Sequence, residues 1–178
     1  GQLWEMNPDG RNPRQVTDIP DGINGYVYAP DMSKIVYLKD VQLEPTVQDL
    51  YPDLPKAKAR IVDDQFYRHW NDWVDAYTHL FIADYVPAQP ITTGKDIMEG
   101  ERWESPVRPW GGVEQLAWTK DGKKLIYTCR KKIGIDYAES TNTDLYAYNT
   151  ENGETVNLTE GMMGYDKNPV ISPNGRYM

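Results

Sequence analysis

The sequence contains little cysteine, histidine or phenylalanine, and it has no long apolar run. Its 178 residues include one cysteine, two histidines and two phenylalanines. The single cysteine, Cys129, cannot form an internal disulfide bond. No apolar run approaches the ~18 residues of a membrane-spanning helix, so we expect no membrane segment. We also identify no signal peptide.

An excess of basic residues is missing as well. The chain has 19 Lys and Arg against 27 Asp and Glu, which gives a net charge of −8. Binding to nucleic-acid phosphates depends on clustered Lys and Arg, so nucleic acid is not an expected partner. Two histidines and one distant cysteine do not supply the three or four convergent ligands of a zinc site. We therefore expect no metal and no cofactor.

Tyrosine and tryptophan, in contrast, are abundant, with 13 Tyr and 6 Trp. These residues favour β-sheets in which the rings are buried and their polar ends reach water. A chain of 178 residues is long enough to bury a sizeable core. The composition therefore predicts a β-rich globular protein.

The stretch 113–128 defines a pattern that the rest of the chain repeats. Apolar residues alternate on both sides of Asp121-Gly122, which is a strong hairpin signal because glycine adopts the positive φ of a tight turn. Residues 26–37 and 168–178 carry similar copies. Repeats of roughly 40–50 residues are typical of propeller blades.

Each hairpin is followed by a second pair of expected strands, as at 144–148 and 155–159. The repeat is therefore a four-strand unit. We predict an all-β fold, a β-propeller fragment with about three blades' worth of four-stranded antiparallel sheets and one helical insertion. The expected units are a half blade at 1–18, a blade at 25–108, a blade at 113–160 and the start of another at 167–178.

The insertion, at about 40–78, interrupts the β pattern between the second and third strands of its blade. Residues 56–73 are expected to form an amphipathic helix, with Asp64 and Arg68 paired on its exposed face. Its apolar stripe falls at Val62, Phe66, Trp70 and Trp73. We expect Trp70 and Trp73 to anchor this helix on its blade.

The blade motifs resemble those of TolB, of WD40-like propellers and of the prolyl oligopeptidase family of serine peptidases. A more specific resemblance is carried by residues 53–60, Asp63-Asp64 and Tyr67-Arg68-His69-Trp70. This stretch is similar to the propeller of the family's bacterial dipeptidyl peptidase branch, of the type-five and acylaminoacyl-peptidase-like kind. The resemblance implies a propeller that gates peptide access to a separate hydrolase domain, and a periplasmic or secreted parent protein.

The resemblance also implies that acidic side chains of the insertion bind the amino end of a peptide substrate. Carboxylates form short, directional hydrogen bonds with an ammonium group. Candidate residues for this site are Asp63, Asp64, Tyr67, Arg68, His69, Trp70 and Asp72. The alternative interpretation is that these carboxylates only form the solvated face of the helix.

No peptidase active site is expected within the chain itself. A nucleophile elbow requires Gly-x-Ser-x-Gly on a strained strand-to-helix turn, and none of the four serines lies in that setting. Without such a serine, His69 and His79 have no nucleophile to activate. We expect the catalytic Ser-Asp-His triad to belong to a hydrolase domain outside this chain.

Three functional hypotheses remain open at this point. The first is a non-catalytic propeller portion of a serine exopeptidase, the second a TolB-like binding module, and the third a stand-alone enzyme. The chain begins halfway through one unit and ends inside another, so we expect a fragment of a larger propeller. Exposed blade edges also favour self-association into a homo-oligomer.

Overall fold

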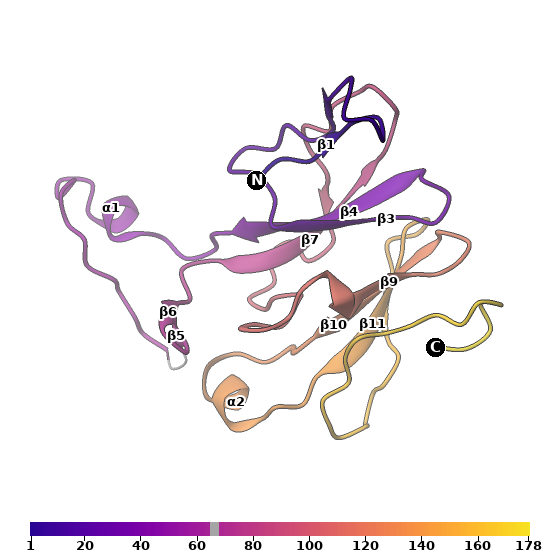
Figure 1. The fold of residues 1–178 in the computed structure, drawn as a ribbon. Helices are drawn as coiled ribbons and strands as arrows, with labels where there is room; N and C mark the ends of the chain where they lie inside the picture. Colours follow the sequence, from indigo (N-terminus) through magenta and orange to yellow (C-terminus); the bar gives the residue numbers. More distant parts are fainter. Residues whose placement is uncertain (65–67) are drawn as a thin grey trace.

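The structure, a computed structural model that describes residues 1–64 and 68–178, consists mainly of short antiparallel strands (Figure 1). Most of them belong to two four-stranded sheets in which every strand pairs with its neighbours in chain order. The first sheet contains β3 (Gly25–Tyr28), β4 (Lys34–Val41), β7 (Tyr77–Asp84) and β8 (Lys95–Asp96). The second contains β9 (Leu116–Trp118), β10 (Lys124–Cys129), β11 (Asp144–Asn149) and β12 (Thr155–Asn157). The expected four-strand repeat and all-β fold are confirmed.

The remaining elements are short. A hairpin of β1 (Trp4–Glu5) and β2 (Arg14–Gln15) precedes the first sheet, and β5 (Arg68–His69) pairs with β6 (Asp72–Trp73). The helical elements are α1 (Val47–Leu50), the 3-10 turn η1 (Val113–Gln115) and α2 (Gly134–Glu139). Within the described residues, no helix has the length and apolar character needed to cross a bilayer.

The hairpin predicted around Asp121-Gly122 is present as β9 and β10. Leu116 pairs with Tyr127 and Trp118 with Leu125, in antiparallel register. Gly122 adopts a φ of +66°, and its N–H donates to the Thr119 carbonyl at 2.9 Å. The turn therefore depends on the positive φ that glycine adopts readily, as the sequence pattern predicted.

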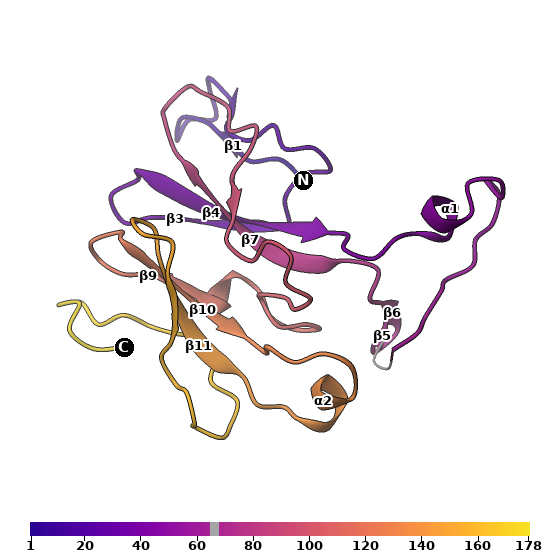
Figure 2. The ribbon, with the colours of Figure 1, turned by 180° about the vertical axis from the view of Figure 1, so that it is seen from behind.

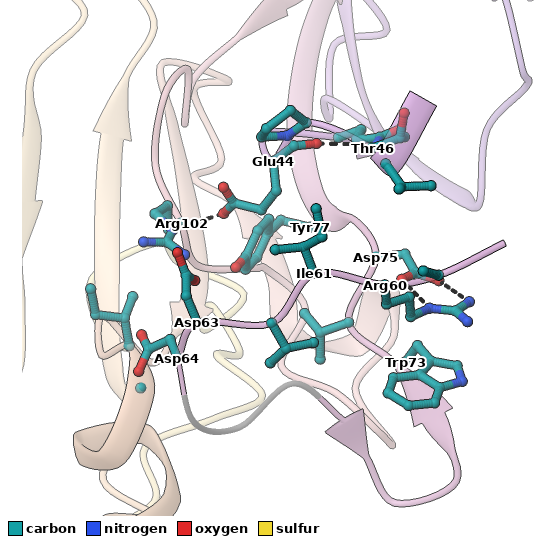
Figure 3. A pocket seen from close by; sticks show the side chains of 18 of the residues that line it. Glu44, Thr46, Arg60, Ile61, Asp63, Asp64, Trp73, Asp75, Tyr77 and Arg102 are labelled. Carbon is teal, nitrogen blue, oxygen red and sulfur yellow. Dashed lines mark hydrogen bonds and ion pairs between the residues drawn. The ribbon is translucent and has the colours of Figure 1, made fainter. Parts of the chain in front are cut away.

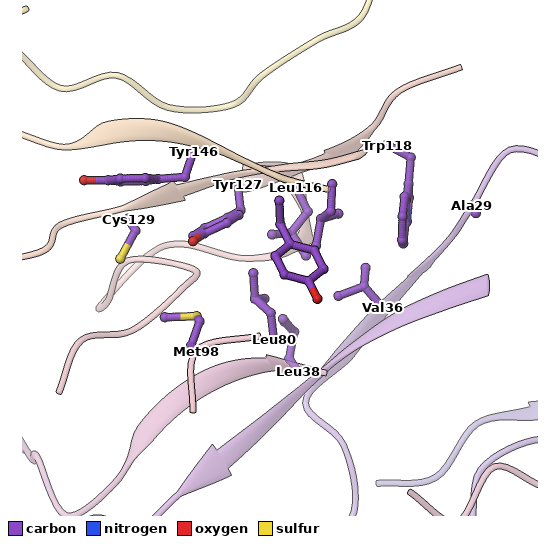
Figure 4. Close-up of a cluster of buried hydrophobic side chains, with 12 residues drawn as sticks. Ala29, Val36, Leu38, Leu80, Met98, Leu116, Trp118, Tyr127, Cys129 and Tyr146 are labelled. Carbon is purple, nitrogen blue, oxygen red and sulfur yellow. The ribbon is translucent and has the colours of Figure 1, made fainter. Parts of the chain in front are cut away.

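Successive side chains of a strand point to opposite faces, and the strand β4 therefore contributes to two separate apolar cores. In β4, Val36 and Leu38 face the second sheet, whereas Ile35 and Tyr37 face the β1–β2 hairpin. β4 is apolar on both faces because it is covered on both. The larger core lies between the two sheets, which stack face to face (Figure 4). It contains Leu80 of β7 and Leu116, Trp118, Leu125 and Tyr127 of the second sheet.

Glu5 ties the β1–β2 hairpin to the first sheet. Its carboxylate accepts hydrogen bonds from the hydroxyls of Tyr28 at 2.7 Å and Tyr85 at 2.8 Å, and from Arg14 Nε at 3.0 Å. Partial burial disfavours the charged form, but the hydrogen bonds from Tyr28, Arg14 and Tyr85 outweigh it and lower the pKa of Glu5. The ionised carboxylate therefore stabilises the fold.

We expect Glu5→Gln to lower the free energy of unfolding by roughly 1 kcal/mol at about pH 6, and by clearly less at about pH 3. Because the folded pKa lies below the unfolded one, the stabilisation is present above the unfolded pKa and is lost as the pH falls through the folded pKa. Urea titrations of both proteins at the two pH values measure the difference. A difference that does not change with pH would contradict this role.

The segment between β4 and β7, residues 42–76, projects from the sheets as an arm. It leaves the pairing of β4 with β7 intact from Lys34↔Asp84 to Val41↔Tyr77. The arm carries α1 and the β5–β6 hairpin, and these lie at the same end of the sheets as α2 (Figures 1 and 2). The arm and the connection from β10 to β11 therefore approach each other.

The prediction of a helix over residues 56–73 is wrong. Residues 58–63 have no regular secondary structure, and Arg68–His69 and Asp72–Trp73 pair as two short strands. Trp70 lies in the turn between them with a φ of +53°, which no α-helix allows. Val62 and Trp73 are exposed rather than packed on a blade. The helical stripe had no core to bury it, so the spacing alone did not determine the structure.

Candidate functional site

A cavity of about 600 Å³ lies between the arm and the second sheet's β10–β11 connection. The first wall comes from the arm and includes Glu44, Thr46, residues 57–64, Trp73 and Asp75. The opposite wall includes Tyr77, Arg102, Trp103, Glu104, Lys132, Ile133, Gly134 and Tyr137. The site is thus assembled from the corresponding strand connections of two successive sheets.

Arg60 and Asp75 fix the two limbs of the arm to each other. The guanidinium of Arg60 donates two hydrogen bonds to the Asp75 carboxylate, Nε at 2.9 Å and Nη2 at 2.8 Å (Figure 3). The same guanidinium lies 4.6 Å from the ring centre of Trp73. The hydrogen bond from Arg60 lowers the pKa of Asp75. The Asp75 carboxylate is therefore already paired with a cationic side chain of the arm itself.

A second ion pair joins the arm to the body. Arg102 Nε lies 2.9 Å from Glu44 Oε1. Burial raises the pKa of Tyr77 against the opposing influence of Arg102. Tyr77 therefore stays a neutral phenol beside Ile61 and Asp63, as Figure 3 shows. Glu44, like Asp75, already has a cationic partner.

Asp63 and Asp64 follow one another on the arm wall, but their surroundings differ. The Asp64 carboxylate lies against the backbone of Gly134, where an added Cβ would stand 2.7 Å from Oδ1. Gly134 also has a φ of +55°, a backbone conformation that favours glycine. Asp63 lines the cavity and is exposed to it. Within the described part of the chain, no hydrogen bond or ion pair engages its carboxylate.

The structure brings only part of the predicted set to the cavity. Asp63 and Asp64 line it. Tyr67 lies outside the described residues. Arg68 and His69 form β5, and their side chains are also outside the described part.

The two other predicted residues lie outside the cavity wall. Trp70 is exposed and packs edge to face on Trp110, with ring centres 5.0 Å apart. Asp72 belongs to β6, opposite His69, and its side chain is exposed. The sequence in turn missed Glu44, Arg102 and Ile133 as site residues. Nothing in their local sequence marks them, because each reaches the cavity from a different part of the chain.

The cavity offers the chemistry of a binding site. It combines an unengaged carboxylate with aliphatic and aromatic walls, which suits a ligand with a cation next to an apolar group. No serine lines it. Among the described residues, no three His, Cys, Asp or Glu side chains cluster in a way that could hold a metal ion.

The fold and the cavity define an all-β protein of stacked four-stranded antiparallel sheets, with a ligand-sized cavity between their connections. No protein family matches the chain in a scan of family profiles.

Among curated proteins the chain is similar to dipeptidyl-peptidase 5 of Porphyromonas endodontalis, at 48% identity over 177 residues, which are 99% of this chain and 26% of the relative. Dipeptidyl-peptidase 5 of Porphyromonas gingivalis is 47% identical over 155 residues, 87% of this chain and 22% of the relative. Dipeptidyl-peptidase 5 of Aspergillus fumigatus is 25% identical over 139 residues, 68% of this chain and 19% of the relative.

The chain spans about a quarter of the length of the two Porphyromonas relatives. The resemblance to dipeptidyl peptidases that the sequence suggested is confirmed at this level: proteins of that name cover nearly the whole chain.

Proposed function

We propose that this chain is the propeller portion of a dipeptidyl peptidase and that its cavity binds the amino end of the peptide substrate. The likeness to proteins named dipeptidyl-peptidase 5 supports the peptidase assignment. The two stacked sheets of identical strand order support a propeller. Peptide hydrolysis is then the task of a hydrolase domain in the rest of the parent protein, and this chain shapes access to it.

The observation that carries the proposal is the state of Asp63. Of the acidic side chains on the arm wall, Glu44 is paired with Arg102 and Asp75 with Arg60. Asp63 lines the same cavity with no partner among the described residues. An ammonium group supplies the charge-assisted hydrogen bonds that this carboxylate lacks. A fixed anchor for the amino end also explains why an enzyme would count residues from that end.

In the full-length protein, we expect Asp63→Asn to raise KM for dipeptidyl reporter substrates by about 10- to 100-fold. This range corresponds to the roughly 1.5–3 kcal/mol of a hydrogen bond to a charged group. The amide keeps the shape of the carboxylate but not its charge. Steady-state kinetics on substrates with a free and with an acetylated amino group measure the effect, which should be confined to the free amine.

Asp72→Asn is the matched control, because Asp72 is an exposed aspartate of the same arm that does not line the cavity. It should leave KM unchanged. An Asp63→Asn protein with the wild-type KM for free-amine substrates would refute the proposed role.

A further inference from the structure

An unpartnered aliphatic wall adjoins Asp63 in the cavity. Ile61 and Val62 of the arm are 53% and 45% exposed, and Ile133 of the facing connection is 44% exposed. All three line the cavity. A ligand that covers large aliphatic side chains in a concave site removes their apolar surface from water, which favours binding.

The position of this wall relative to Asp63 restricts the ligand. Ile61, Val62 and Asp63 are consecutive residues, and Figure 3 shows Ile61 and Asp63 on the same stretch of the arm. In a peptide, the free ammonium group and the first side chain are both bonded to the same Cα atom. A peptide whose ammonium group is bound at Asp63 therefore carries its first side chain next to the aliphatic wall.

Ile133 completes the wall from the second sheet. The chain turns tightly before it, where the Lys132 N–H donates to the Arg130 carbonyl at 2.8 Å. Directly after it, the backbone of Gly134 lies against the Asp64 carboxylate. Ile133 lines the cavity between these two contacts. The second sheet thereby contributes to a site whose charged group belongs to the arm of the first.

We infer that this wall selects peptides whose first residue carries a sizeable aliphatic side chain, and that Ile133 is a specificity-determining residue. The inference rests on the proposed function, because it takes the ammonium group to be bound at Asp63. Glycine at the first position leaves the wall open to water, whereas leucine covers it. Since each buried methylene favours binding, the preference should grow with the size of the side chain.

The test is a series of dipeptidyl reporters with Gly, Ala, Val, Leu or norleucine first and a constant second residue, cleaved by the full-length protein. The ratio of kcat/KM between Leu and Gly should be about tenfold or more. Ile133→Ala should reduce this ratio several-fold. Ile135→Ala is the matched control, since Ile135 is an exposed isoleucine in α2, at 53% against 44% for Ile133, that does not line the cavity.

The outcomes separate the inference from the function on which it rests. The inference would be overturned if kcat/KM of the wild-type protein were the same for every substrate in the series. It would also be overturned if Ile133→Ala, like Ile135→Ala, left the Leu-to-Gly ratio of kcat/KM unchanged. If Asp63→Asn weakens every substrate by the same factor and preserves the Leu-to-Gly ratio, the inference is supported. Failure of the proposed function has a different signature, an Asp63→Asn protein whose KM is unchanged for every substrate in the series.

Discussion

Leu80→Ala is expected to lower the free energy of unfolding by about 3–5 kcal/mol. Leu80 lies in β7, is fully buried and packs in the core between the two sheets. β7 is an interior strand between β4 and β8, so the sheet has little freedom to collapse around a lost side chain. The loss then combines the transfer free energy of the removed atoms with the cost of the cavity that remains.

Chemical denaturation monitored by tryptophan fluorescence measures this loss, because Trp118 belongs to the same core. Leu54→Ala is the matched control. Leu54 lies on the arm and is 51% exposed, so its replacement should change the unfolding free energy by less than about 0.5 kcal/mol. Equal effects of the two substitutions would show that the sheets do not share a cooperative core.

His79→Ala is expected to lower the free energy of unfolding by about 3–5 kcal/mol. His79 is fully buried in β7. Its Nδ1 lies 2.8 Å from Asp96 Oδ2, and its Nε2 lies 3.0 Å from the Glu101 carbonyl. The imidazole thereby joins β7 to β8 and to the turn beyond it. Its removal leaves a largely buried carboxylate and a carbonyl without their partner.

A double-mutant cycle with Asp96→Ala tests this account. If the two side chains act as a pair, the double variant should be less destabilised than the sum of the single ones by at least about 1 kcal/mol. Simple additivity would contradict the pairing and would leave only the lost volume of the imidazole to explain the effect.

The sheets could be predicted from the sequence because their signals are local. Alternation around Asp121-Gly122 predicts β9 and β10, and the corresponding pattern at residues 26–37 predicts β3 and β4. Each strand also needs apolar side chains on the face that a neighbouring sheet covers, as Val36 and Ile35 illustrate on opposite faces of β4. Short-range pattern and long-range packing agree in these segments.

The conformation of the arm could not be predicted because its short-range sequence pattern and its long-range packing disagree. The spacing of Val62 and Trp73 suits a helical stripe, but both side chains remain exposed and neither is buried in a core. Its conformation depends instead on individual contacts, such as the bidentate pair of Arg60 with Asp75. Contacts of this kind join residues that are far apart in the sequence, and no periodicity reveals them.

Of the predicted site residues, Asp63 and Asp64 line the cavity, and their role in binding stays a prediction. The opposite wall, with Arg102 and Ile133, depends on how the second sheet stacks on the first. That arrangement is a property of the tertiary structure and leaves no mark in the sequence around either residue.

The uninterrupted pairing of β4 with β7 across the base of the arm has a consequence for how such proteins diversify. Because this pairing extends to Val41↔Tyr77, the two residues that flank the arm, we expect residues 42–76 to tolerate changes in length and composition while the two strands stay paired. We expect insertions, deletions or exchange of this excursion to alter the cavity wall that it forms while the two sheets keep their strand order. The same property makes it a practical point for grafting recognition loops onto a stable β scaffold.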